Sequence, residues 1–179
     1  IGICGGYQML GKEIRDPHHT ESNHDGTTGL GFLDMATTFI ESKLTSQVTA
    51  DCHDWNFMGT KISAKDLHGY EIHMGETEFF GDKDEHPITI TERRGEKCAV
   101  EEGTSRADGM VFGTYIHGIF DHDEFRRAML NVLRVKKGLE PLENTRSLFA
   151  EKQRAYDRLA ETVRANLDMD KVREILAAQ

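Results

Sequence analysis

The sequence GICGGYQ, residues 2–8, has the pattern glycine-x-cysteine-x-glycine, which is typical of a sharp turn from a β-strand into an α-helix. Gly2 and Gly6 predict a bend where larger side chains would collide and where unusual dihedral angles are needed. Cys4 at the start of the helix would be favoured as a thiolate, and the Gly5 N–H would point to a forming oxyanion. The stretch predicts a nucleophilic cysteine, and the alternative is a small buried cysteine in a glycine-rich turn.

A second stretch, GTYIHGIF at residues 113–120, is an apolar, strand-like run that ends in a histidine followed by a glycine. A cysteine nucleophile needs a base that is distant in sequence and close in space. His117 would reach Cys4 if both residues followed strands of one parallel sheet, because sites gather at the carboxyl ends of such strands. We therefore predict a catalytic pair, and the alternative is a histidine that merely terminates a strand.

Three stretches together resemble the glutamine amidotransferase domain of the cobyric acid synthase family, which belongs to the cobalamin pathway. They are CGGYQMLG at 4–11, GYEIHMG at 69–75 and GTYIHGIF at 113–120. The likeness runs in order from residue 1 to about residue 142. Gln8, four residues after the cysteine, resembles the cobyric acid branch, whereas the sister cobyrinic acid diamide synthases resemble a form without that glutamine.

The resemblance implies an activity and a set of site residues. Cys4 and His117 would hydrolyse the side-chain amide of L-glutamine, with the Gly5 N–H in the oxyanion hole. The ammonia would pass to a synthetase domain, where ATP activates carboxylates of a corrinoid for amidation. No cofactor is expected on this chain, and ATP and Mg would belong to the synthetase domain. The residues implied to border the glutamine site or the docking face are Gln8, Tyr70, Glu71 and His73.

The residue that orients His117 is left open by the sequence. Related enzymes with a catalytic triad usually have a glutamate two residues after the histidine, and here that position is Ile119. Asp121 and Asp123 are possible replacements, although capping of the following helix is the more common role for an aspartate at such a position. A backbone carbonyl could orient the histidine instead.

Composition excludes several classes of function. The 179 residues carry a formal net charge of −9, which argues against a nucleic-acid partner. No apolar run approaches the roughly 18 residues of a membrane span, and no signal peptide is visible. Three scattered cysteines suggest a reducing cytoplasm rather than a disulfide framework. The histidines at 18, 19 and 24 favour a solvated loop over a metal site, so we expect no metal.

Alternating strand and helix patterns predict an α/β fold with a mostly parallel sheet flanked by helices. The resemblance makes this a class I glutamine amidotransferase-like fold with flavodoxin-like layers. We expect an N-terminally truncated domain over residues 1–142, because only three residues precede the predicted turn. Residues 143–179 are predicted to form helices that pack on the same domain.

Individual elements follow from hydrophobic periodicity and turn residues. A helix is predicted from Gly6 to Ile14, a long exposed loop over 18–29, and a strand pair over 67–80 around Gly69 and Gly75. Meander strands are expected near residues 88–100. The predicted C-terminal helices are one that starts at Asp121 or Asp123 and runs to Lys137, one from Leu148 to about Asn166, and one over 172–176.

Two other classes of function compete with the amidotransferase prediction. A cysteine γ-glutamyl hydrolase or peptidase could use the same turn, with water as the only acceptor and no partner domain. A noncatalytic interaction domain could keep the fold without the chemistry. Hydrolysis of free glutamine would distinguish the amidotransferase from the hydrolase or peptidase. Labelling of Cys4 by a glutamine-analogue inhibitor would distinguish the amidotransferase from a noncatalytic domain.

Overall fold

The computed structural model describes residues 1–81, 83–143 and 147–178, and the chain forms two compact units, Ile1–Glu143 and Asn144–Gln179. The first unit contains all three stretches on which the functional prediction rests. The second contains the two last helices. The predicted domain boundary and the predicted packing of those helices on the domain stay predictions.

The smaller sheet of the first unit carries the predicted nucleophile. Its four strands are, in spatial order, β1 (Gly2–Ile3), β10 (Phe112–Thr114), β9 (Thr104–Arg106) and β6 (Asp84–Glu85). β1 and β10 are parallel, with Gly2 opposite Gly113 and Ile3 opposite Thr114. This pairing places the strand that leads into Cys4 beside the strand that precedes His117, although more than 100 residues separate the two strands in the sequence.

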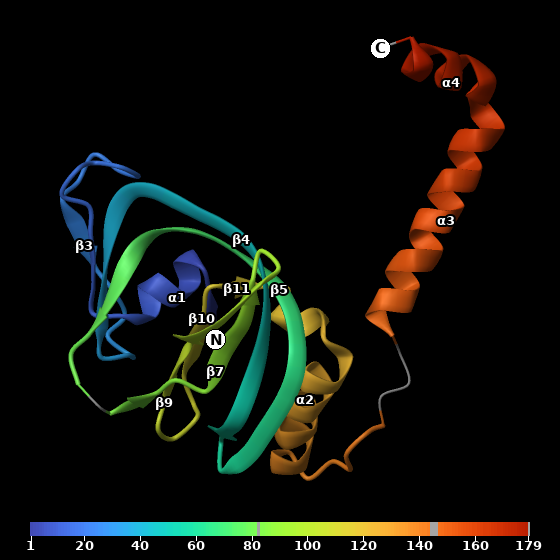
Figure 1. Ribbon diagram of the computed structural model, residues 1–179. Coiled ribbons are helices and arrows are strands. Elements are labelled where there is room, and N and C mark those ends of the chain that lie inside the picture. Colours follow the sequence, from blue (N-terminus) through green and yellow to red (C-terminus); the bar gives the residue numbers. More distant parts are fainter. Residues whose placement is uncertain (82, 144–146, 179) are drawn as a thin grey trace. The chain divides into compact units, whose positions relative to one another are not determined.

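The larger sheet is built on one long antiparallel hairpin, which curves around helix α1 (Gly5–Leu10) (Figure 1). The hairpin strands are β4 (Met35–Phe57) and β5 (Thr60–Phe79). The other strands are β2 (Glu13–Arg15), β3 (Gly26–Thr28), β7 (Ile88–Arg93), β8 (Glu96–Glu102) and β11 (Ile116–His117). β11 pairs with β5, so the larger sheet reaches the predicted base.

The α/β class is confirmed, but the prediction of a mostly parallel sheet is wrong for the described residues. Both sheets are mixed, and among the described strands only β1–β10 and β2–β4 are parallel pairs. The reason lies in two-residue turns, Met58-Gly59 and Arg94-Gly95, where all four residues have positive φ. Such turns join neighbouring strands directly as antiparallel hairpins, whereas parallel strands need a long crossover.

Three predicted elements have different bounds in the structure. The first helix ends at Leu10, because Gly11 adopts an extended conformation, and Ile14 lies in β2 instead. The segment 67–80, predicted as two strands, belongs to the single strand β5. The predicted loop over 18–29 ends in β3, which pairs with β2. In each case the strand that pairs with the segment lies elsewhere in the sequence, so the local hydrophobic pattern could not predict the bounds.

The helix after His117 begins at Asp123, within one residue of the start that either predicted aspartate cap implies. A short 3₁₀ helix, η1 (Ile119–Asp121), precedes α2 (Asp123–Lys136). His122 is the residue that caps α2, since its side chain accepts from the Phe125 N–H at 3.4 Å. The prediction of an aspartate cap at Asp121 or Asp123 is therefore wrong.

The core of the first unit contains two apolar clusters. The larger one surrounds Trp55, which packs on Phe112 and Phe125 and donates its indole N–H to Ser105 at 2.8 Å. Trp55 is therefore a packing residue. The smaller cluster lies beneath the strand-to-helix turn and consists of Tyr7, Leu10, Leu33, Met35 and Tyr115.

The second unit contains helices α3 (Leu148–Asn166) and α4 (Met169–Ala177), close to their predicted bounds. Ser147 caps α3 and Asp168 caps α4, each by accepting a backbone N–H from the first turn. None of the helices in the described part of the chain is both long enough and apolar enough to cross a membrane.

Candidate active site

Cys4 sits on the bend between β1 and α1 with φ 55° and ψ −118°, a backbone conformation that a residue with a side chain rarely adopts. Its N–H donates to the Thr114 carbonyl at 2.9 Å, and its own carbonyl accepts from the N–H groups of Tyr7 and Gln8. The bend is therefore held on both sides by backbone hydrogen bonds. This is the strand–nucleophile–helix geometry that the sequence predicts.

The two glycines that flank the bend have different roles. A Cβ on Gly2 would collide with the backbone carbonyl of Gly6 and lie 2.8 Å from the Tyr7 nitrogen, so the close approach of β1 and α1 requires glycine there. A Cβ on Gly6 would meet no atom within 4 Å. The prediction of a collision is confirmed at Gly2 and wrong at Gly6, because Gly6 lies on the exposed side of α1.

We expect Gly2→Ala to lower the free energy of unfolding by about 1–3 kcal/mol, the usual cost of overpacking. Gly6→Ala should leave stability unchanged or raise it, because alanine is the better helix former. Urea unfolding of both variants measures this difference. Equal losses in the two variants would contradict the proposed contact with the Gly6 carbonyl.

His117 is placed by the pairing of β11 with β5. Ile116 lies opposite Glu71 and His117 opposite Tyr70, and the rings of Tyr70 and His117 stack with centroids 4.8 Å apart. Gly69 permits this pairing, because a Cβ there would collide with the carbonyl oxygen of His117. The first glycine of the GYEIHMG stretch thus has a direct role in positioning the predicted base.

Cys4 and His117 each contact the same short stretch of β5. The Cys4 thiol donates to the Ile72 carbonyl at 3.4 Å, and His117 is in register with Tyr70, two residues away on that strand. Two residues of strand span about 7 Å. His117 Nε2 is buried and has no hydrogen-bond partner among the described residues. The Nε2 atom thus has hydrogen-bonding capacity that no described residue uses.

Glu71 and His73 lie on the opposite face of β5 from Tyr70. The buried Glu71 carboxylate accepts from the Arg93 guanidinium at 3.0 and 3.3 Å, whereas its Oε1 is 4.0 Å from His73 Nε2. The His73 ring stacks on Tyr115 with centroids 3.8 Å apart. Glu71 is therefore primarily the partner of Arg93, a residue that no sequence motif marked.

Burial shifts the pKa values of both residues away from their charged forms. It raises the pKa of Glu71, while the positive charge of Arg93 acts in the opposite direction. Burial lowers the pKa of His73, and the charge of Arg93 adds to this effect. His73 is consequently a neutral ring beside an ion pair.

The remaining predicted site residues lie near this stretch in different environments. Gln8 is buried and its amide donates to the Met74 carbonyl at 3.0 Å, which ties α1 to β5. Tyr70 is half-exposed, and Gly5 is exposed as the first residue of α1. Asp121 is exposed at the end of η1, where its N–H donates to the Gly118 carbonyl. Their roles in binding or catalysis stay predictions.

Glu102 is a buried carboxylate that sequence analysis missed. It is the last residue of β8, and it accepts from the Thr114 hydroxyl at 2.6 Å and from the Tyr115 N–H at 2.5 Å. In the sequence it follows Glu101 in an alternating strand pattern, and nothing distinguishes the two glutamates. Only the pairing of β8 with β7 determines which of them faces inward.

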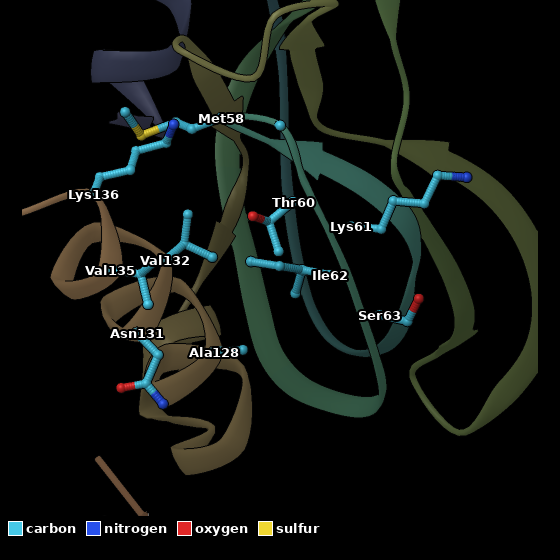
Figure 2. Close-up of a pocket in the computed structure, with 11 residues that line it drawn as sticks. Met58, Thr60, Lys61, Ile62, Ser63, Ala128, Asn131, Val132, Val135 and Lys136 are labelled. Atoms are coloured by element: carbon cyan, nitrogen blue, oxygen red, sulfur yellow. The ribbon is translucent and has the colours of Figure 1, made fainter. Parts of the chain in front are cut away.

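Of the cavities in the first unit, two differ in whether predicted site residues line them. The one in Figure 2, of about 770 Å³, lies between the β4–β5 turn and α2, and none of the predicted site residues lines it. A second cavity, of about 570 Å³, is lined by side chains around Tyr7, including Glu71, His73, Arg93, Glu102 and Tyr115. This second cavity therefore adjoins Glu71 and His73, whereas Cys4 and His117 are not among the described residues that line it.

Comparisons with known proteins identify the family of this chain. Residues 1–125 match the CobB/CobQ-like glutamine amidotransferase domain, and the chain belongs to this family. Its relatives include a protein named cobyric acid synthase from Thermoanaerobacter sp. (strain X514), 44% identical over 178 residues, which are 98% of this chain and 35% of that protein.

Further relatives carry the same name. The protein from Caldanaerobacter subterraneus subsp. tengcongensis is 43% identical over 98% of this chain and 35% of its own length. The protein from Streptococcus sanguinis (strain SK36) is 44% identical over 98% of this chain and 33% of its own length. The chain thus spans about a third of the length of the curated relatives it matches.

Proposed function

We propose that this chain is the glutamine amidotransferase portion of a cobyric acid synthase. The observation that carries the proposal is the strained Cys4 bend, held against the same stretch of β5 as His117 with its unpartnered Nε2. Membership of the amidotransferase family and the shared name of the relatives support it. The hydrolase and noncatalytic alternatives have no comparable support.

The proposed reaction releases ammonia from L-glutamine in two steps. The Cys4 thiolate attacks the side-chain amide carbon to form a C–S bond, and the Gly5 N–H stabilises the oxyanion. Protonated His117 gives its proton to the leaving nitrogen as the C–N bond breaks. His117 then takes a proton from water, which attacks the thioester and releases glutamate and the thiolate.

The rest of the proposal concerns the complete enzyme. Ammonia would be consumed by a synthetase portion that uses ATP and Mg²⁺ to amidate carboxylates of a corrinoid. We assign both cofactors to the synthetase portion, because the proposed hydrolysis of glutamine by Cys4 and His117 uses neither of them. Flavodoxin-like layers would need further parallel strands from elsewhere in the parent protein.

The proposed setting is the cytoplasm, with neither nucleic acid nor membrane as a partner. All three cysteines are free thiols in the structure, which suits a reducing compartment. The net charge of −9 is the opposite of what nucleic-acid binding selects.

Substrate profiling of the complete protein tests the proposal. We expect hydrolysis of free L-glutamine, and with ATP and a corrinoid acid we expect incorporation of the amide nitrogen into the corrinoid. γ-Glutamyl peptides and polyglutamates should be poor substrates. Preferential cleavage of those peptides, with no nitrogen transfer to a corrinoid, would overturn the proposal in favour of a hydrolase.

A further inference from the structure

The hydrogen bonds of Glu102 converge on the segment that links the predicted nucleophile and base. Its two oxygens accept from the Thr114 hydroxyl and the Tyr115 N–H, and its side chain is almost fully buried. Buried carboxylates are rare unless they are paired, and the partners here are neutral groups rather than a cation. Such a costly arrangement calls for a reason beyond packing.

The residues that Glu102 holds also contact Cys4 and precede His117. The Thr114 carbonyl accepts the Cys4 N–H at 2.9 Å, and the Thr114 hydroxyl accepts the Ile116 N–H at 3.0 Å. His117 is the next residue after Ile116. A shift of residues 114–116 would therefore move the nucleophile and the base by different amounts.

We propose that Glu102 is a positioning residue, which fixes residues 114–116 and thereby sets the placement of Cys4 relative to His117. The inference rests on the proposed function, because it takes Cys4 and His117 as the reacting pair. Positioning of this kind has a large effect on rate, since a displacement of about 1 Å can cost about 10²-fold.

The protonation state of Glu102 determines how firmly it holds the segment. Burial raises the pKa of Glu102 to about 7, the Thr114 and Tyr115 hydrogen bonds oppose this shift, and the charge of Glu71 adds to it. The other titratable or charged groups that face the same cavity are Tyr7 on α1, His73 and Glu76 on β5, His86, Arg93 on β7, Glu101 on β8 and Tyr115.

The two protonation states differ in their hydrogen bonds. The Tyr115 N–H can only donate, so the added proton would lie on Oε2 and face the Thr114 hydroxyl. That hydroxyl already accepts from Ile116 N–H and would lose the acceptor for its own proton. The ionised form is therefore the one that satisfies every group in the segment.

Glu102→Gln tests the proposal in the complete protein, because the glutamine amide can only donate where Oε2 accepted and so imitates the protonated form at every pH. We expect kcat for glutamine hydrolysis to fall about 10- to 100-fold with KM little changed. The wild-type profile should contain an ionisation near pH 7 that the variant lacks. Glu101→Gln, an exposed neighbour on the same strand, is the matched control and should behave as wild type.

Thr114 provides a second pair of variants that does not depend on the folding of Glu102→Gln. Thr114→Val removes the hydroxyl and should reproduce the loss, whereas Thr114→Ser keeps it and should retain most of the activity. The double variant Glu102→Gln/Thr114→Val should lose little more than Thr114→Val alone, because both substitutions remove the hydrogen bond from the Thr114 hydroxyl to Glu102, and Thr114→Val also removes the acceptor of the Ile116 N–H.

Alkylation of Cys4 by iodoacetamide at several pH values separates this inference from the proposed function. Its rate should change in Glu102→Gln and Thr114→Val but not in Glu101→Gln. A wild-type protein without glutaminase activity would contradict the proposed function alone, since alkylation needs no glutamine. A lower melting temperature with unchanged kcat, pH profile and alkylation rate would show that Glu102 only stabilises the fold, and the inference would fail.

Discussion

Replacing Cys4 with serine in the complete protein is expected to abolish glutamine-dependent amidation and to leave amidation with added ammonia intact. The thiolate is the only protein nucleophile in the proposed mechanism, and loss of such a group typically costs on the order of 10⁶-fold in kcat. Serine is nearly isosteric and can occupy the same bend, so the fold should persist. Product formation measured with each nitrogen source in parallel separates the two activities.

Cys98 provides the control for this substitution. It is also a half-buried free thiol, donating to the Ile90 carbonyl at 3.6 Å, but it lies on β8 away from the bend. Cys98→Ser should keep both activities. If Cys4→Ser lost ammonia-dependent and glutamine-dependent amidation equally, the proposal that Cys4 serves only to release ammonia from glutamine would be wrong.

Replacing His117 with asparagine is expected to remove glutamine turnover with little change in melting temperature. His117 acts as both acid and base in the proposed mechanism, and general acid–base catalysis contributes about 10²–10⁴-fold. Asparagine keeps the backbone pairing with Tyr70, which holds β11 in place. Stopped assays of glutamate release, together with thermal unfolding, measure both quantities.

His68 is the matched control, because it is an exposed histidine on β5 whose Nδ1 lies 3.2 Å from the Thr49 hydroxyl. His68→Asn should retain full turnover. Turnover by His117→Asn close to that of wild type would remove His117 from the mechanism.

Asp121→Ala answers the open question of what orients His117. If this variant lost as much turnover as His117→Asn without a change in melting temperature, Asp121 would be the third catalytic residue. Retained turnover would leave that role to another group.

Much of the site could be predicted because its constraints are local. Gly2 and Cys4 are needed for one tight bend, and the Cys4 dihedral angles match the motif. His117 followed by Gly118 marks the end of a strand, and Gly118 has the expected left-handed conformation. The backbone geometry of a few consecutive positions requires these residue types, so a short sequence pattern is enough to predict them.

The parts that could not be predicted depend on pairing between distant segments. Arg93 and Glu102 occupy strands with ordinary alternating patterns, and their burial follows from the register of β7 against β4 and β8. Gly69 and Gly75 suggested breaks in a strand, yet both lie in β5 and allow a neighbouring strand to approach closely. Gly69 faces the His117 carbonyl of β11, and Gly75 faces the Thr38 carbonyl of β4. His122 caps α2 where two aspartates were better candidates by propensity. Tertiary contacts decided each case.

The parallel pairing of β1 with β10 also has a consequence for the order in which the protein folds. The β4–β5 and β7–β8 hairpins need only contacts between neighbouring strands, which close quickly. The Cys4 bend needs Thr114, more than 100 residues later, for its backbone hydrogen bond. During synthesis, the Cys4 segment must therefore wait for the β10 segment. A nascent chain would form the two hairpins independently of the bend that carries the proposed nucleophile, and the proposed glutamine hydrolysis could begin only after residues 112–114 have been made.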